Sequence, residues 1–79
     1  QYLMGEYEVI EAEIIETSEL ISKELKNSNL PNEIRIGAIL RSNKIIIPRS
    51  DFKFQKEDRV VFIAQKDSIS IVENLFRLS

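Results

Sequence analysis

Residues 30–62 read LPNEIRIGAILRSNKIIIPRSDFKFQKEDRVVF and hold three strand patterns separated by turns, which is the strongest indication of fold class in the chain. Residues 34–41 follow the period of two that is typical of a half-buried strand. Ser42-Asn43 indicates a turn, and the return strand stops at Pro48, whose missing N–H cannot serve a central ladder. Residues 60–64 are apolar on both faces and predict the most central strand. The alternation over 34–41 places Ile34, Ile36, Ala38 and Leu40 on one face, and Arg35, Gly37, Ile39 and Arg41 on the other.

The flanking segments predict one more strand and two helices. In residues 8–15 apolar side chains alternate with Glu11 and Glu13, which is the pattern of a strand with one buried face and one solvent-exposed face. A short helix is expected from about Ser22 to Asn27, with Ser22 as its N-cap. The sequence therefore predicts a small α/β domain of α+β type, in the order β-α-β-β-β-α, with four to five strands and two helices. The last helix, capped by Asp67 or Ser68, would carry one apolar stripe made of Ile71, Val72, Leu75, Phe76 and Leu78.

Size and composition point to a partner. The chain has 79 residues, 43% of them hydrophobic, and a domain of this length buries only about 60 to 65% of its unfolded surface. Small domains often gain stability from disulfides, metals or partner subunits, and this chain contains neither Cys nor His. We therefore expect a homodimer. The chain begins at Gln1 in mid-pattern, so we interpret residues 1–79 as a single domain excised from a longer protein, with residues 1–6 as a lead-in.

The two signs of charge are unevenly distributed along the chain. Residues 1–33 hold eight acids and two bases, whereas residues 34–79 hold five acids and nine bases. Either these charges are solvated faces of strands and helices, or an acidic edge of one subunit meets a basic edge of another. Nucleic-acid binding is not expected, because the bases are dispersed and no set of stacking aromatic residues accompanies them.

Catalytic and metal-binding patterns are weak. Glu11 and Glu13 would lie about 7 Å apart on one strand face, but alternation alone explains them. Asp51, Glu57 and Asp58 lack the spacing of a calcium loop. We predict no enzymatic activity, no metal site and no cofactor in this chain.

A series of short motifs resembles the C-terminal regulatory domain of TrkA-type proteins, a module that regulates conductance in bacterial Trk and Ktr potassium systems. The resemblance covers nearly everything from Glu8 to Phe76, and it depends on the order and spacing of the motifs. Ser22, Ser50 and Glu57 stand where the family usually has glycine. If Glu57 adopts a positive φ, the cost is roughly 1 kcal/mol. The motifs are EVIEA at 8–12, Ser18 to Lys23, Leu30-Pro31, IGAI at 36–39 with Arg41, IPRSD at 47–51, DRV at 58–60, VE at 72–73 and LF at 75–76.

The resemblance implies a ligand-sensing and dimerising domain in the cytoplasm, peripheral to the inner face of the membrane, where it controls a TrkH-type potassium transporter. NAD or ATP would bind to Rossmann domains outside this chain. Some relatives bind the cyclic dinucleotide c-di-AMP between two such domains, through the loop before a strand and the start of that strand. The matching residues in this chain are Leu30, Pro31, Asn32, Arg35 and Ile36. Alternatively, Arg35 is a solvated strand residue and Leu30 is a core anchor, and neither contacts a ligand.

The same resemblance leaves the dimer and the function with alternatives. The homodimer is expected to form through a sheet edge or through the Gly37 face, since Gly37 lacks a side chain and suits close packing. Gly37, Ile39 and Arg41 are the residues expected at this seam. One alternative is a passive homodimerisation module that binds no ligand. The other is a stand-alone enzyme or an ACT-like small-molecule-binding domain, which would need a second helix before its last strand, where residues 49–57 resemble a loop.

Overall fold

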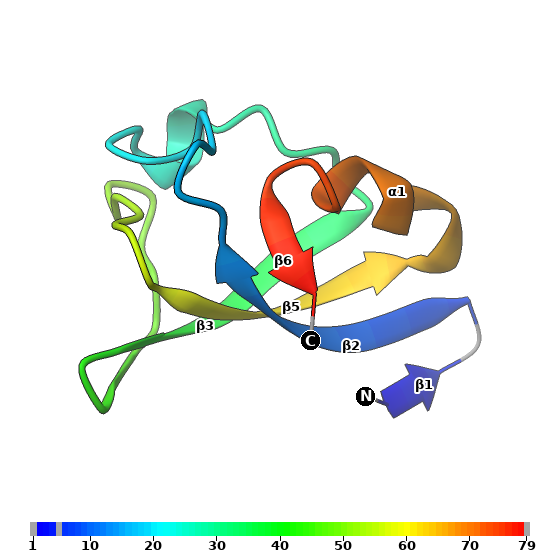
Figure 1. Ribbon diagram of the computed structural model, residues 1–79. Helices are drawn as coiled ribbons and strands as arrows, with labels where there is room; N and C mark the ends of the chain where they lie inside the picture. The colour runs from blue at the N-terminus through cyan, green and yellow to red at the C-terminus, as the bar shows by residue number, and fades with distance from the viewer. Residues whose placement is uncertain (1, 5, 79) are drawn as a thin grey trace.

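One antiparallel sheet organises the chain (Figure 1), which the computed structural model describes over residues 2–4 and 6–78. The strands run in the order β1-β2-β5-β3-β4, with β5 in the centre as the sequence predicted. β6 also pairs with β2, so β1 and β6 share one edge of that strand. The sheet therefore has six strands, and the expected four to five was too few. Their bounds are β1 (Tyr2–Met4), β2 (Tyr7–Ile14), β3 (Ile34–Arg41), β4 (Lys44–Ile46), β5 (Arg59–Gln65) and β6 (Phe76–Leu78).

The predicted hairpin between β3 and β4 is confirmed. Arg41 lies opposite Lys44, and the two residues between them, Ser42 and Asn43, have φ values of 50° and 65°. Two consecutive positive φ angles match the two-residue turn whose twist agrees with that of the flanking strands.

A bulge at Gly37 changes the faces of β3. Ile36 lies opposite Phe62, and Ala38 lies opposite the next residue of β5, Val61, so one residue of β3 is extra. An inserted residue exchanges the two faces for everything that follows it. Ile39 consequently lies in the core with no exposed surface. The expected placement of Ile39 and Arg41 on the Gly37 face is wrong for this reason.

The helix expected over 22–27 is absent from the described chain, which forms only a 3-10 turn there, η1 (Leu25–Asn27). Ser22 has a φ of 73° and so cannot serve as an N-cap in extended backbone. Instead, the N–H groups of Ser22 and Leu25 donate to the carbonyls of Phe54 and Phe52, at 3.2 and 2.7 Å. Pairing with a distant loop has replaced a helix that was too short to be stable alone.

The predicted last helix is mostly wrong as well. The chain forms a 3-10 turn, η2 (Lys66–Ser68), and one helical turn, α1 (Ile69–Val72), before it reverses and enters β6. Phe76 therefore lies in a strand, opposite Ile14. Its burial, which a helical stripe would also explain, comes from the sheet.

The core lies between one face of the sheet and the segments that cross above it in Figure 1, including α1. Three phenylalanine rings join these layers: the centroid of Phe76 lies 5.4 Å from that of Phe62 and 6.1 Å from that of Phe54. The buried apolar side chains are Ile10, Ala12, Ile14, Leu20, Ile34, Ile39, Phe54, Val60, Phe62, Ala64, Val72 and Phe76.

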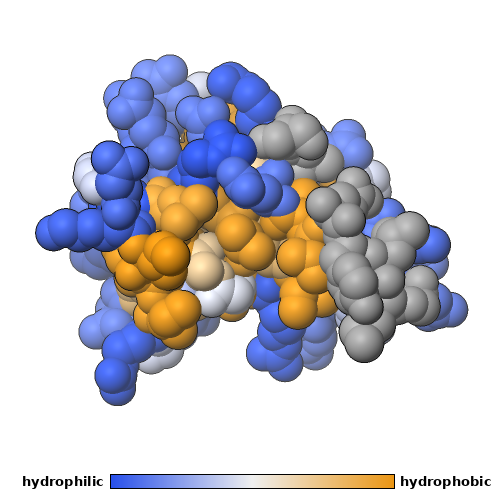
Figure 2. Space-filling model, turned by 90° about the horizontal axis from the view of Figure 1, so that it is seen from below, coloured by the Kyte–Doolittle hydropathy of each residue, from blue (hydrophilic) through white to orange (hydrophobic). Residues whose placement is uncertain are grey.

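The opposite face of the sheet is covered by no element among the residues that the structure describes (Figure 1). We call it the open face. Figure 2 views the molecule from this side and shows apolar side chains gathered in the middle, with hydrophilic ones around them. By register and alternation, its apolar residues are Tyr7, Val9, Ala38, Leu40, Ile45, Val61 and Ile63.

Candidate functional site

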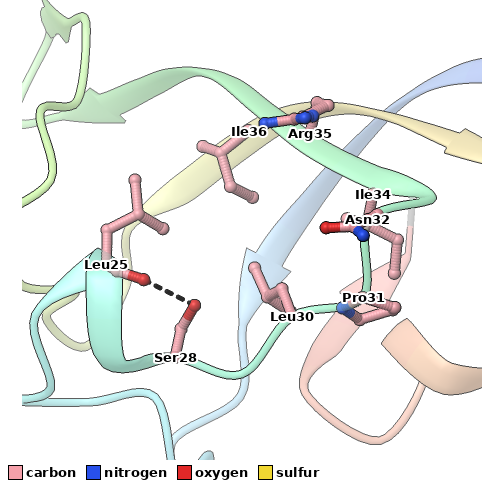
Figure 3. Close-up of a pocket in the computed structure, with 8 residues that line it drawn as sticks. All are labelled: Leu25, Ser28, Leu30, Pro31, Asn32, Ile34, Arg35 and Ile36. Atoms are coloured by element: carbon pink, nitrogen blue, oxygen red, sulfur yellow. Dashed lines mark hydrogen bonds between the residues drawn. The ribbon is translucent and has the colours of Figure 1, made fainter.

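A hollow of about 210 Å³ lies where the segment after η1 meets the start of β3 (Figure 3). All five residues that the sequence singled out for ligand binding line it, so the fold brings them together. The hollow is bordered by Leu25, Ser28, Leu30, Pro31, Asn32, Ile34, Arg35 and Ile36.

The walls of the hollow are apolar. The side chains of Leu25, Leu30 and Ile36 come from three different segments and converge in Figure 3. Each is half-buried and packs against the core from its own side. Ligand sites of this type bind a flat or apolar group against such walls and use a few polar atoms for orientation.

The loop that forms the floor is held by backbone hydrogen bonds. The N–H of Ile34 donates to the carbonyl of Pro31 at 3.0 Å, and the N–H of Gln65 donates to the carbonyl of Glu33 at 3.1 Å. The hydroxyl of Ser28 donates to the carbonyl of Leu25 at 2.7 Å, so its proton is already committed. The exposed amide of Asn32 remains available for a ligand. The walls are therefore positioned before any ligand binds.

Arg35 borders the hollow but its side chain leaves β3 in the other direction. It lies opposite Ile63 of the open face, whereas Ile36 lies opposite Phe62 of the core. Because successive side chains of a strand point to opposite faces, Arg35 extends over the open face. A phosphate in the hollow would have to reach around the edge of β3 to meet this guanidinium.

The hollow is too small to enclose a dinucleotide. Sites that bury a drug-sized ligand measure about 300 to 1,000 Å³, against about 210 Å³ here. Beside it, β4 pairs only with residues 39–41 of β3, so no described strand pairs with the outer edge of β3 from 34 to 38. A second wall can therefore approach the hollow along this edge.

The residues expected at the dimer seam fall in three different environments. Gly37 is exposed, and a Cβ built on it would lie 3.4 Å from the carbonyl oxygen of Val61, so the sheet itself does not require glycine. Ile39 is fully buried. Arg41 is held by Asp58 on the covered side. Of the three, Gly37 alone is exposed.

Sequence reasoning missed the role of Asp58. This carboxylate is 1% exposed and accepts hydrogen bonds from Nε and Nη2 of Arg41, at 2.8 and 2.7 Å, and from the N–H of Gln55 at 2.8 Å. The hydrogen bond to Asp58 raises the pKa of the Arg41 guanidinium above its ordinary value. The guanidinium also lies 5.0 Å from the ring centre of Phe52. Asp58 thus fixes the loop before β5.

Among the described residues, no cluster of three side chains that could ligate a metal ion occurs.

The strand glutamates are engaged by an arginine. Nε of Arg59 lies 2.7 Å from Oε2 of Glu11, and its Nη1 lies 4.0 Å from a carboxylate oxygen of Glu13. All three groups are on the open face and remain partly exposed. Glu11 and Glu13 share one strand face, as alternation predicted, and the structure adds that they form an ion cluster with Arg59.

Comparisons with known proteins agree with these motifs. Residues 9–77 match the family described as the TrkA-C domain. Over 77 residues the chain is 43% identical to the "Trk system potassium uptake protein TrkA" of Azorhizobium caulinodans, covering 98% of this chain and 17% of that protein. Over 64 residues it is 39% identical to the "Trk system potassium uptake protein TrkA homolog" of Archaeoglobus fulgidus, covering 81% of this chain and 15% of that protein.

A "Trk system potassium uptake protein TrkA homolog 1" of Methanosarcina mazei is 34% identical over 70 residues, which cover 89% of this chain and 16% of that protein. The chain thus spans about one sixth of the length of these relatives. The hollow lies inside the matched segment. Within residues 2–4 and 6–78, no helix has the length and apolar character needed to cross a membrane.

Proposed function

The chain belongs to the TrkA-C domain family, and from this premise we propose that it is a regulatory domain of a potassium uptake system. In this role it binds a small ligand and pairs subunits, and it has no catalytic activity of its own. The regulated partner is a potassium transporter in the membrane, and the domain works at its cytoplasmic face.

One observation carries the ligand-sensing part of the proposal: the five residues selected from the sequence line one hollow with half-buried apolar walls. Its loop is held by the backbone hydrogen bond between Pro31 and Ile34. A site that is formed in advance loses little conformational freedom when it binds. The walls suit a nucleobase, and a small nucleotide is the proposed effector.

The size of the hollow makes it one half of a site. A ligand as large as a cyclic dinucleotide would bridge the hollows of two copies, since one copy encloses too little of it. Such a ligand favours the arrangement of subunits in which both halves face each other. Regulation follows if the transporter distinguishes that arrangement from the unliganded one. NAD or ATP would bind to other domains of the longer protein.

A second candidate function is passive pairing of subunits without a ligand. The exposed apolar side chains of the open face favour it, since they suit contact with another chain whether or not a ligand is present. An ACT-like domain is a poorer match, because residues 47–58 form no helix before β5.

Thermal unfolding of the 79-residue chain with a panel of nucleotides distinguishes the two functions. The panel comprises c-di-AMP, cyclic AMP, AMP, ADP, ATP and NAD. Regulation predicts that at least one member raises the midpoint, since a ligand that binds only the folded state stabilises it. If no member does so at millimolar concentration, passive pairing is the better account.

A matched pair of leucine substitutions locates the binding. Leu30 and Leu75 are both half-buried against the core, but Leu30 lines the hollow and Leu75 does not. Leu30→Ala is expected to weaken binding of the stabilising nucleotide about tenfold, which is the effect of losing one apolar wall. Leu75→Ala should leave the affinity unchanged. Equal losses in the two variants would place the ligand elsewhere.

A further inference from the structure

The open face carries exposed large apolar side chains on three strands, β2, β4 and β5. Ile63 of β5 is 43% exposed, Tyr7 at the start of β2 is 42% exposed, and Ile45 of β4 is 71% exposed. Contiguous apolar surface of this kind on a small domain marks an interaction site more often than an ordinary surface. Figure 2 shows hydrophobic side chains gathered across the middle of this side of the molecule.

The apolar side chains form a diagonal band across three strands. Reading the register from β2 to β3, the band begins at the neighbours Val9 and Ile63, crosses Val61 and Ala38, and ends at Leu40. Ile45 extends it onto β4, since it lies opposite Leu40. The band therefore runs obliquely to the strands and divides the open face into two flanks.

The two flanks carry different charges. On one side are Glu11 and Glu13 with Arg59 between them and β3. On the other side is Arg35, which is exposed and forms no ion pair with any described residue. Arg35 and Glu13 are two strands and four residues of β5 apart, or about 17 Å, so they cannot pair within one chain.

We propose that the open face binds the open face of a second copy, with the two-fold axis along the apolar band, so that Arg35 of each copy lies between Glu11 and Glu13 of the other. An isologous contact requires that the surface complement itself after a two-fold rotation. A rotation of 180° about the band exchanges its two flanks. Arg35 of each copy therefore meets Glu11 and Glu13 of the other copy, and the contact is made twice. The oblique axis makes the strands of the two sheets cross at a large angle.

The choice of a second copy over another partner follows from this exchange of flanks. Arg59 stays with Glu11 inside each subunit, so the two carboxylates retain a negative charge in excess that Arg35 of the partner can neutralise. The apolar band is then removed from water on both subunits at once. Ile36 and Leu30 lie on the covered side of β3, so the two hollows lie on the outer sides of this dimer, and a ligand that bridges two hollows would join copies through a separate contact along the outer edge of β3.

The inference rests on the proposed function only in taking from it that two copies pair. It is tested by a charge-exchange cycle on the 79-residue chain, followed by sedimentation equilibrium from about 1 to 500 µM. Arg35→Glu and Glu13→Arg are each expected to raise the dimer dissociation constant about tenfold or more, because each places like charges across the seam. The double variant restores one pair of opposite charges across the seam, between residues 35 and 13, and should dimerise more tightly than either single variant.

Charge reversals elsewhere serve as controls. Lys23→Glu and Glu19→Arg make the same changes of charge at exposed positions outside the sheet, and should leave the dissociation constant unchanged. Circular dichroism of every variant identifies any that fails to fold. If a single variant fails to fold, the dissociation constant of the folded double variant tests the seam. A chain that is monomeric at every concentration, a double variant no better than the worse single one, or controls that weaken pairing equally would each overturn the proposed seam.

The seam and the proposed function fail separately. A monomer that still binds a nucleotide would overturn the seam and leave sensing in place. A dimer with the expected charge cycle but no response to any nucleotide would support the seam and contradict sensing.

Discussion

Arg41 and Asp58 join the end of β3 to the start of β5 through two hydrogen bonds, at 2.8 and 2.7 Å, with the carboxylate almost fully buried. Because a bulge at Gly37 turns Arg41 to the covered side, the pair depends on an irregularity in the strand. The same carboxylate accepts the N–H of Gln55 and so fixes the intervening loop. One buried acid thereby ties together three parts of the chain.

Removal of this acid should be costly. Asp58→Ala leaves the Arg41 guanidinium and the Gln55 N–H without their partner, and the free energy of unfolding is expected to fall by about 2 to 4 kcal/mol. Glu16→Ala breaks the exposed pair with Lys56 and should cost less than about 0.5 kcal/mol. Urea denaturation measures both. Similar losses in the two variants would show that Asp58 has no special role.

The pH dependence of this pair follows from the raised pKa of Arg41. A base whose pKa is higher in the folded state adds stability below its unfolded pKa and loses it as the pH rises through the folded pKa. For arginine both values lie in strongly alkaline solution. Between pH 7 and 10 the Arg41–Asp58 pair should therefore keep its full contribution to the free energy of unfolding, and the difference between the original chain and Arg41→Met should stay constant. A difference that shrinks near pH 9 would contradict the raised pKa of Arg41.

Ser22, Ser50 and Glu57 stand where the family usually has glycine, and they differ in backbone conformation. Glu57 and Ser22 have φ values of 70° and 73°, whereas Ser50 is not among the residues with positive φ. Glu57→Gly and Ser22→Gly should each raise the free energy of unfolding by about 0.5 to 1 kcal/mol, because glycine adopts positive φ without strain. Ser50→Gly relieves nothing and should be neutral or slightly destabilising. Equal effects at all three positions in urea denaturation would contradict this division.

Two isoleucines of similar exposure test which apolar surface is used for pairing. Ile63 on the open face is 43% exposed and Ile71 on α1 is 46% exposed. Ile63→Asp places a charge in the apolar band and should convert the dimer to monomer at about 50 µM, as measured by light scattering. Ile71→Asp should leave the mass unchanged. The reverse result would move the interface to α1.

The regular parts of the fold were predictable and the irregular parts were not. Alternation located β2 and β3, since a strand with one buried face leaves that period in the sequence, and the apolar run at 60–64 located β5. It could not reveal the bulge at Gly37, because residues 38–40 are all apolar and hide the change of phase that an inserted residue causes. Ile39 was therefore assigned to the wrong face.

The helix predictions were wrong for a different reason. Residues 22–27 and 69–78 carry helical spacing, but their backbones are fixed by partners far away in the sequence. Phe76 pairs with β2, and Leu25 donates to Phe52. Contacts of this kind override weak local preference in short segments. The position of the hollow was predictable because its loop and strand adjoin in sequence. The alternation also placed Arg35 on the opposite face of the strand from Ile34 and Ile36, and the register confirms this, so Arg35 and Ile36 do not point into the same hollow.

If two copies sense one small nucleotide through paired hollows, the 79-residue chain binds c-di-AMP with a stoichiometry of one ligand for every two chains. Isothermal titration of the chain, with Leu30→Ala and Leu75→Ala measured beside it, should give saturable heat at this stoichiometry. Leu30→Ala should weaken the binding about tenfold, and Leu75→Ala should leave it unaffected. No heat at millimolar ligand from c-di-AMP or any other nucleotide of the panel, or binding that both variants weaken equally, would contradict sensing through paired hollows.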